Sequence, residues 1–328
     1  MNACLIGVGS IGGDKHNDVD NKKTAVKTHA HALYNNREYF DNIYIVDKNI
    51  EPLTRVCDKW DFKESFVDLD FLLKESEHID FFVIATPQET HLELFKKIAP
   101  HKPKSVLIEK PCGNSQDECN DIGWIAAKFN IKVFVDYQRN FIYGLPLLDG
   151  LDKVKKIVLN YTRGFIRDGS HFFALLAKEQ LEMPYDIKLL SAVNDLDDIK
   201  DLTYTLFFKI TGKQGEKVEV FMNGFDGRIA DVFEIMFYGD KENVSLVDHG
   251  KLRLNAAHEE EKTFGKGYKS FSNTTLATMT DLENGLECVH DDITLFLNTS
   301  SSLFYQGSYK HALEAWTMME QIKGVING

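Results

Sequence analysis

An apolar run that ends in regularly spaced glycines constrains the fold of this chain more than any other feature of its sequence. Residues 3–6 are apolar, and Gly7, Gly9 and Gly12 follow in the spacing Gly-x-Gly-x-x-Gly. After a buried strand, such glycines permit a tight turn, close approach of the backbone to a pyrophosphate, and packing of a helix on the strand. A glycine-rich turn can also follow any buried strand, so the motif needs support from the rest of the sequence.

Patterns typical of strands and helices alternate from the N-terminus to Asn140. Apolar runs predict strands within 42–49, 78–87, 104–113 and 131–141, a short strand and the start of a helix lie within 64–75, and helical patterns fill most of the intervals. This alternation predicts a parallel sheet covered by helices. We therefore expect a dinucleotide-binding α/β domain of the Rossmann type over residues 1–140.

The cofactor is expected at the carboxyl ends of these strands, where doubly wound sheets bind their ligands. Asp47 follows the second strand, and its carboxylate is placed to accept hydrogen bonds from the ribose hydroxyls of NAD. Its charge would repel a 2′-phosphate, which favours NAD over NADP, although the neighbouring Lys48 weakens the preference. The residues predicted to bind the cofactor are Gly7, Gly9, Ser10, Ile11, Gly12, Asp47, Thr86, Pro87, His91, Glu109 and Gln138.

A polar stretch separates the glycine motif from the first helical pattern. Asp47 lies 35 residues after Gly12, whereas the acidic residue of the usual unit follows after about 20. We interpret this stretch, at about residues 14–27, as an insertion. Its His16, Asp18 and Asp20 could form a metal cluster, but a solvated loop is the simpler interpretation, and we predict no metal site.

The pattern changes after residue 140. Strand-like segments separated by short turns predict an antiparallel meander, and amphipathic helical patterns close the chain. We expect a second, α+β domain over residues 141–328, with a large, mostly antiparallel open sheet that binds substrate and mediates oligomerisation. A sheet with one uncovered apolar face usually packs against a copy of itself, so a homodimer or homotetramer is predicted.

Composition excludes several classes of partner. The formal net charge of −12 argues against nucleic acid and acidic membranes as partners, and no basic patch overrides it. No apolar run is long enough to span a bilayer, and no signal-peptide pattern precedes the first strand, which favours a cytoplasmic protein. The five scattered cysteines fit reduced thiols better than disulfides.

The order of motifs resembles the Gfo/Idh/MocA family of oxidoreductases, named for glucose-fructose oxidoreductase and inositol dehydrogenase. The resemblance rests on GVGSIGG, Asp47, IATPQETH, IEKP and VDYQRNF, and on a histidine with x-x-Ala-Leu after it, here His29. The family spacing after Gly12 would place this histidine at position 15, and its shift to position 29 matches the proposed insertion. The resemblance implies an NAD(P)-dependent enzyme that acts on CH–OH groups of a sugar, sugar nucleotide or cyclitol.

The resemblance also suggests catalytic residues. His171 would take the hydroxyl proton as hydride leaves, and Lys110 would stabilise the developing alkoxide. Family members carry an aspartate four residues before this histidine, whereas here Arg167 holds that position and Asp168 lies three residues before. Lys110, His171 and Asp168 are the catalytic candidates. The substrate-binding candidates are Lys110, Tyr137, Arg163, Arg167 and His171.

Simpler interpretations remain open for each of these residues. Lys110 could be a surface lysine at a strand end, His171 a capping or core histidine, and Asp168 an ordinary turn residue. The departure at Arg167 favours an alternative function, a dinucleotide-binding sugar sensor or regulator without turnover. A reductase of a diol or a linear pigment is a further alternative, which absence of His171 would have favoured.

Overall fold

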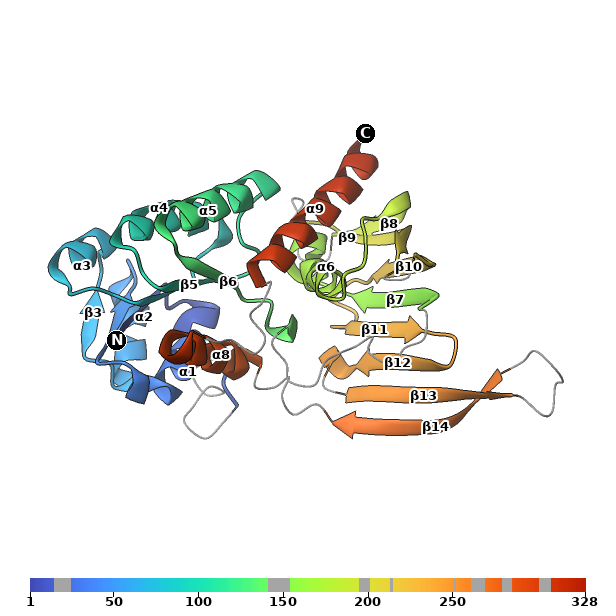
Figure 1. Ribbon diagram of the computed structural model, residues 1–328, viewed down its shortest axis with the longest axis horizontal. Helices are drawn as coiled ribbons and strands as arrows, with labels where there is room; N and C mark the ends of the chain where they lie inside the picture. Colours follow the sequence, from blue (N-terminus) through green and yellow to red (C-terminus); the bar gives the residue numbers. More distant parts are fainter. Residues whose placement is uncertain are drawn as a thin grey trace. The chain divides into compact units, whose positions relative to one another are not determined.

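A computed structural model of the chain contains two compact units (Figure 1). It describes residues 1–14, 25–140, 154–194, 201–212, 215–250, 252–260, 269–278, 285–300 and 308–328. The first unit consists of Met1–Tyr143 and Glu283–Leu313, and the second of Gly144–Leu282 and Glu314–Gly328. The predicted insertion at about 14–27 lies largely outside the described residues.

The first unit is built on a six-stranded parallel sheet with the strand order β3-β2-β1-β4-β5-β6. Every residue of β1, β4 and β5 is buried, because helices cover both faces of the sheet. This arrangement confirms the predicted Rossmann-type fold. The strands are β1 (Asn2–Ile6), β2 (Asn42–Val46), β3 (Glu64–Phe66), β4 (Phe81–Ile84), β5 (Ser105–Ile108) and β6 (Lys132–Val135).

Side-chain caps start three helices of this unit. Thr28 accepts a hydrogen bond from the backbone N–H of His31, Asp68 from Asp70 and Phe71, and Ser115 from Glu118. The helices are α1 (His29–Asn35), α2 (Ile50–Trp60), α3 (Leu69–Glu75), α4 (His91–Ile98), α5 (Gln116–Phe129) and α8 (Gly285–Thr299). Shorter helical turns are η1 (Ser10–Asp14), η2 (Arg37–Tyr39), η3 (Gln88–Thr90), η4 (Ala99–His101) and η5 (Gln138–Asn140).

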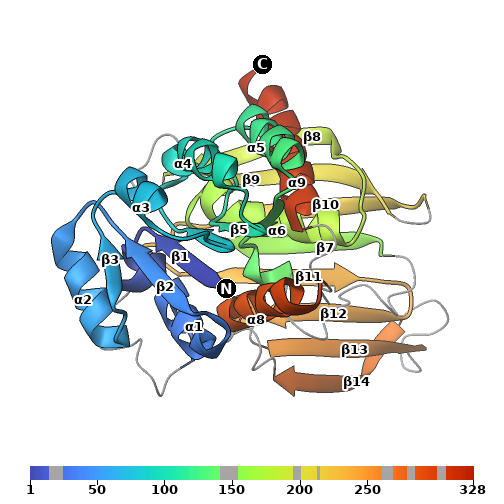
Figure 2. The same cartoon turned by 60° about the vertical axis from the view of Figure 1, so that its left-hand side comes forward.

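Helix α8 returns from late in the sequence to the first unit, beside α1 (Figure 2). Its Val289, Ile293 and Leu297 belong to the same apolar core as Leu5 and Phe134. The sequence pattern predicts that all of residues 141–328 belong to the second domain. In the structure, Glu283–Leu313 belong to the first unit instead, because the apolar side of α8 completes the core of the Rossmann sheet.

The second unit contains an eight-stranded sheet with the order β14-β13-β12-β11-β7-β10-β9-β8. The pair β7 and β10 is parallel and the other neighbours are antiparallel, which confirms a large, mostly antiparallel sheet. It is not the single meander that the turn spacing predicted, because β7 lies between two runs of consecutive strands. The strands are β7 (Lys156–Tyr161), β8 (Tyr185–Val193), β9 (Thr203–Thr211), β10 (Lys217–Gly224), β11 (Phe233–Tyr238), β12 (Glu242–Val247), β13 (Leu252–Glu260) and β14 (Lys269–Thr278).

Burial alternates along the central strands of this sheet, so that one face is buried and the other partly exposed. Helix α6 (Gly169–Lys178) is buried from Gly169 to Ala177, and its Phe173 stacks on Phe208 of β9. The closing helix α9 (Ser308–Asn327) buries Trp316, Met319 and Ile322. Two further turns are η6 (Gly164–Asp168), which precedes α6, and η7 (Asp248–Gly250).

Within the described part of the chain, no helix combines the length and the apolar character that crossing a membrane requires.

Candidate cofactor site and catalytic residues

A pocket of about 480 Å³ lies at the carboxyl ends of the parallel strands in the first unit. Gly7, Gly9, Asp47, Thr86 and Pro87 line it, together with apolar residues such as Val67 and Leu69. These side chains and backbone groups come from the turns after β1, β2 and β4 and from the segment around α3. The pocket therefore lies where a doubly wound sheet binds its ligand.

Two glycines shape the turn at the base of the pocket. Gly7 has a φ of +88°, which side-chain-bearing residues rarely adopt. A Cβ atom on Gly12 would lie only 2.0 Å from the carbonyl oxygen of Gly7. The first and third glycines of the motif are therefore required by the turn itself, while Gly9 has open space on its Cβ side and lines the pocket.

The Asp47 carboxylate is held in place by two backbone donors. Its Oδ2 atom accepts a hydrogen bond from the N–H of Val8 at 2.9 Å, and its Oδ1 atom accepts one from Asn49 at 2.8 Å. The bond from Val8 joins the turn after β1 to the turn after β2, and the bond from Asn49 lies within the turn after β2. Each oxygen retains a lone pair that can accept a further hydroxyl hydrogen bond.

His91, a predicted cofactor ligand, has a different environment. Its ring is buried, with Nε2 at 2.9 Å from the carbonyl oxygen of Thr86 and Nδ1 at 3.2 Å from that of Pro111. Burial lowers the pKa of His91, although its backbone partners oppose the shift. The ring thus connects the loop after β4 to the loop after β5. Other predicted cofactor residues that are described but do not line this pocket are Ser10, Ile11, Gly12, Glu109 and Gln138.

Glu109, immediately before Lys110, points into the protein. His29 Nε2 lies 3.0 Å from its Oε1 atom, and its Oε2 atom accepts the backbone N–H of Lys110 at 3.0 Å. Burial would raise the pKa of Glu109, but the hydrogen bond and charge of His29 lower it below its usual value. Asp136 lies beside it, and burial together with the charge of Glu109 raises the pKa of Asp136 well above its usual value. Lys110 itself is partly buried, and Tyr137 is fully buried.

In the second unit, His171 lies in the first turn of α6 and is 6% exposed. Its ring meets Phe233 edge-on, with 6.3 Å between the centroids. Asp168 Oδ2 lies 3.2 Å from Arg163 Nε, and Arg163 Nη2 lies 2.9 Å from Asp231. The shifted aspartate is therefore paired with one of the predicted substrate-binding arginines, while Arg167 is exposed.

Asp201 positions the turn that leads to His171. Its carboxylate accepts the backbone N–H groups of Ile166 and Arg167 at 2.7 and 2.9 Å. Gly164 has a φ of +88°, and a Cβ atom there would lie 2.2 Å from Asp201 Oδ2. Sequence reasoning missed Asp201 because it lies in a polar stretch far downstream of the turn that it holds.

These features define the first unit as a dinucleotide-binding domain. Residues 1–137 match the model of the Gfo/Idh/MocA family, described as an oxidoreductase family with an NAD-binding Rossmann fold. This match confirms the resemblance to that family inferred from the motifs of the first unit.

Individual relatives extend this comparison. Rhizopine catabolism protein MocA of Rhizobium meliloti is 31% identical over 74 residues, a match that spans 23% of each protein. The WlbA dehydrogenase of Bordetella pertussis, solved with NADH and UDP-GlcNAcA, has a TM-score of 0.72 at 15% identity and covers 99% of this chain and 96% of its own. A putative myo-inositol dehydrogenase of Sinorhizobium meliloti has a TM-score of 0.71 at 15% identity, covering 100% and 97%. The last two show that both units share a known fold.

Proposed function

We propose that this chain is an NAD-dependent oxidoreductase that transfers a hydride between the nicotinamide and a hydroxyl-bearing carbon of a sugar, sugar nucleotide or cyclitol. The observation that carries the proposal is the pocket of the first unit, in which the glycine turn and the fixed Asp47 carboxylate meet. The glycine turn suits a pyrophosphate and Asp47 a ribose. The sugar class is supported by the UDP-GlcNAcA bound to the WlbA dehydrogenase and by the name of the putative myo-inositol dehydrogenase.

In this proposal, the residues of the chain divide the chemistry of alcohol oxidation between them. NAD⁺ accepts the hydride when bound. His171 takes the hydroxyl proton as the hydride leaves, and the Lys110 ammonium stabilises the negative charge that develops on the same oxygen. Asp168, the last residue of η6, forms an ion pair with Arg163, and the pair can orient His171 or bind a substrate oxygen. Tyr137 and Arg167 remain candidates for substrate binding.

Turnover measurements test the function directly. The purified chain is mixed with NAD⁺ and a panel of sugars, sugar nucleotides and cyclitols, and NADH formation is followed by absorbance. The proposal expects turnover with at least one member of this panel. Tight NAD⁺ binding with no turnover on any of them, in either direction, would contradict it.

A sensor or regulator without turnover is the second candidate function. It is favoured by Arg167 at the place of the family aspartate and by the pairing of Asp168 with Arg163. Binding of a sugar ligand that changes the affinity for NAD without reduction of the cofactor would support this alternative.

Asp47→Ala is expected to remove the preference for NAD over NADP. The carboxylate would repel a 2′-phosphate and accept hydrogen bonds from the ribose hydroxyls, so the variant should bind NAD(H) more weakly and NADP(H) at least as well as the wild type. Calorimetric titration with both cofactors at one ionic strength measures this. Lys48→Ala, which keeps the acid, should increase the preference, and equal affinities of the wild type for the two cofactors would contradict the prediction.

We further propose a homodimer or homotetramer that forms through the second unit. Phe207, Phe221, Val158 and Met236 are in register across β9, β10, β7 and β11, and all four are only half-buried on one face of the sheet. Such an apolar row is suited to burial against a second copy. Light scattering should give a dimeric or tetrameric mass, and Phe221→Asp should reduce it to that of a monomer. A monomeric wild type, or an unchanged assembly in Phe221→Asp, would contradict this; Phe71→Asp, at an exposed position on α3, is the control.

A further inference from the structure

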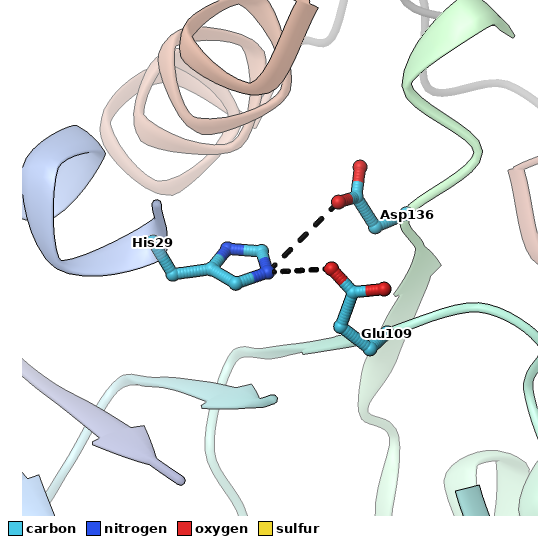
Figure 3. Close-up of side chains that lie close together, drawn as sticks. All are labelled: His29, Glu109 and Asp136. Carbon is cyan, nitrogen blue, oxygen red and sulfur yellow. Dashed lines mark hydrogen bonds and ion pairs between the residues drawn. The ribbon is translucent and has the colours of Figure 1, made fainter. Parts of the chain in front are cut away.

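A cluster of ionisable side chains that the proposed hydride transfer does not use lies inside the first unit. Figure 3 shows His29, Glu109 and Asp136 pointing toward one another. His29 begins α1, and Glu109 and Asp136 immediately follow β5 and β6. Their residues are 0%, 8% and 3% exposed, respectively. We call these three residues the buried cluster.

The distances within the buried cluster approach those of a metal coordination sphere. His29 Nε2 lies 3.0 Å from Glu109 Oε1 and 3.9 Å from Asp136 Oδ2. One donor atom from each residue lies within 4.8 Å of the other two. Zinc bonds to histidine nitrogen and carboxylate oxygen are about 2.0–2.2 Å long, so ligand atoms around one ion are about 3–4 Å apart. Small side-chain movements would bring all three donors onto one ion.

A bound cation would balance the negative charges of the buried cluster. Two carboxyl groups face each other in the interior, where two negative charges are unfavourable without compensation. A shared proton would neutralise one carboxyl group and a protonated His29 the other, whereas a divalent cation would compensate both charges and leave His29 neutral. Asp136 Oδ1 is also buried and has no hydrogen-bond partner. An unpaired buried carboxylate oxygen is costly, and a bound cation would offset its charge directly.

Groups around the buried cluster hold the donor atoms in the way that outer residues orient metal ligands. The Nδ1 atom of His29 lies 2.9 Å from Nε2 of His290 on α8. When His29 Nδ1–H donates to His290, the lone pair of His29 Nε2 is directed at the carboxylates. Glu109 Oε2 is occupied by the backbone N–H of Lys110, which leaves Oε1 for an ion. Metal-binding histidines commonly have such a partner on the second nitrogen.

We propose that His29, Glu109 and Asp136 bind one divalent transition-metal ion of the zinc type. Imidazole and carboxylate together suit zinc better than magnesium or calcium, which prefer oxygen ligands alone. The three side chains are buried and the proposed hydride transfer does not use them, so we assign the ion a structural role, with a water molecule as the fourth ligand of a tetrahedral site. It ties the first residue of α1 to the residues that follow β5 and β6.

The test uses untagged full-length protein that has been stripped of metal with a chelator and returned to a chelator-free buffer. Zn²⁺ is added, excess ion is removed by gel filtration, and metal per chain is measured by elemental analysis. We expect one zinc ion per chain and a rise in Tm of at least about 4 °C with saturating Zn²⁺. Mg²⁺ at the same concentration should leave Tm unchanged.

Asp136→Asn and His29→Gln should each weaken zinc binding by more than about 100-fold, because loss of outer partners alone costs 10–100-fold. Asp136→Asn keeps the shape of the side chain, so its zinc affinity can still be measured if His29→Gln fails to fold. His101→Gln, which removes an exposed imidazole, should retain the full metal content. His290→Gln should bind zinc with intermediate affinity.

Three results would overturn the proposal. The wild type could retain no zinc, the variants could retain as much as the wild type, or Zn²⁺ could leave Tm unchanged. If the wild type binds no zinc and Asp136→Asn has a Tm at least as high as the wild type, a proton shared by the two carboxyl groups takes the place of the metal ion. These results do not depend on turnover, so they separate the metal site from the proposed hydride transfer.

Discussion

Lys110→Ala and His171→Ala are each expected to lower kcat by about 100- to 10,000-fold, the range that a general base or a positioned charge contributes. Neither residue is proposed to hold the cofactor, so the affinity for NAD(H) should remain within a fewfold of the wild type. Steady-state kinetics with the best substrate from the panel give kcat, and calorimetric titration with NAD⁺ gives the affinity.

The double variant makes this prediction sharper. If Lys110 and His171 act on the same oxygen, the double variant should lose much less kcat than the product of the two single losses. Removing either residue already disables the shared step. Lys128→Ala and His101→Ala remove exposed side chains of the same kinds and should leave kcat unchanged. Wild-type turnover in the double variant would rule out this mechanism.

Asp168→Asn shows what the displaced aspartate does. A large loss of kcat would mean that Asp168 still orients His171 although it pairs with Arg163. A rise in KM with kcat unchanged would instead assign the pair to substrate binding.

Gly12→Ala should abolish high-affinity binding of NAD(H) and destabilise the first unit. The new Cβ atom would lie 2.0 Å from the Gly7 carbonyl oxygen, a backbone atom that cannot move without opening the turn. Overpacking of this kind costs about 1–3 kcal/mol or more. We expect a lower Tm and a Kd for NAD⁺ raised by more than about 100-fold, since each 1.4 kcal/mol is a factor of ten and the turn itself holds the pyrophosphate.

Gly9→Ala is the matched control within the same motif. A Cβ atom on Gly9 meets no atom within 4 Å, so Tm should stay at the wild-type value. Because Gly9 lines the pocket, the methyl group should still weaken NAD⁺ binding by crowding the bound cofactor. Equal Tm values and equal NAD⁺ affinities for Gly12→Ala and the wild type would contradict this account of the motif.

The metal site that we propose at His29, Glu109 and Asp136 is one that the sequence did not lead us to expect. That expectation considered only His16, Asp18 and Asp20, which lie close together in the sequence. His29 is 80 residues from Glu109, and its partner His290 is 261 residues away. Asp136 has one sequence signal: a carboxylate directly after a buried strand, at the edge of the sheet where ligands bind.

Much of the fold follows from local patterns in the sequence. The buried strands, the alternation of strand and helix, and the glycine turn each depend on residues within one element, so their types and order could be predicted. Gly7, Gly9, Asp47, Thr86 and Pro87 were placed in one pocket for the same reason, since the carboxyl ends of parallel strands meet at one edge of the sheet.

Only the tertiary structure decided which distant segments share a core and which polar groups pair. Helix α8 joins the first unit because its apolar side fits the Rossmann core, and β7 lies in the middle of its sheet because it pairs with both β10 and β11. Periodicity shows that a face is apolar but not what covers it. The role of His91 between two carbonyl oxygens, and the pairing of Asp168 with Arg163, likewise depend on contacts that carry no local signal, because each is selected by burial and hydrogen bonding in the folded chain.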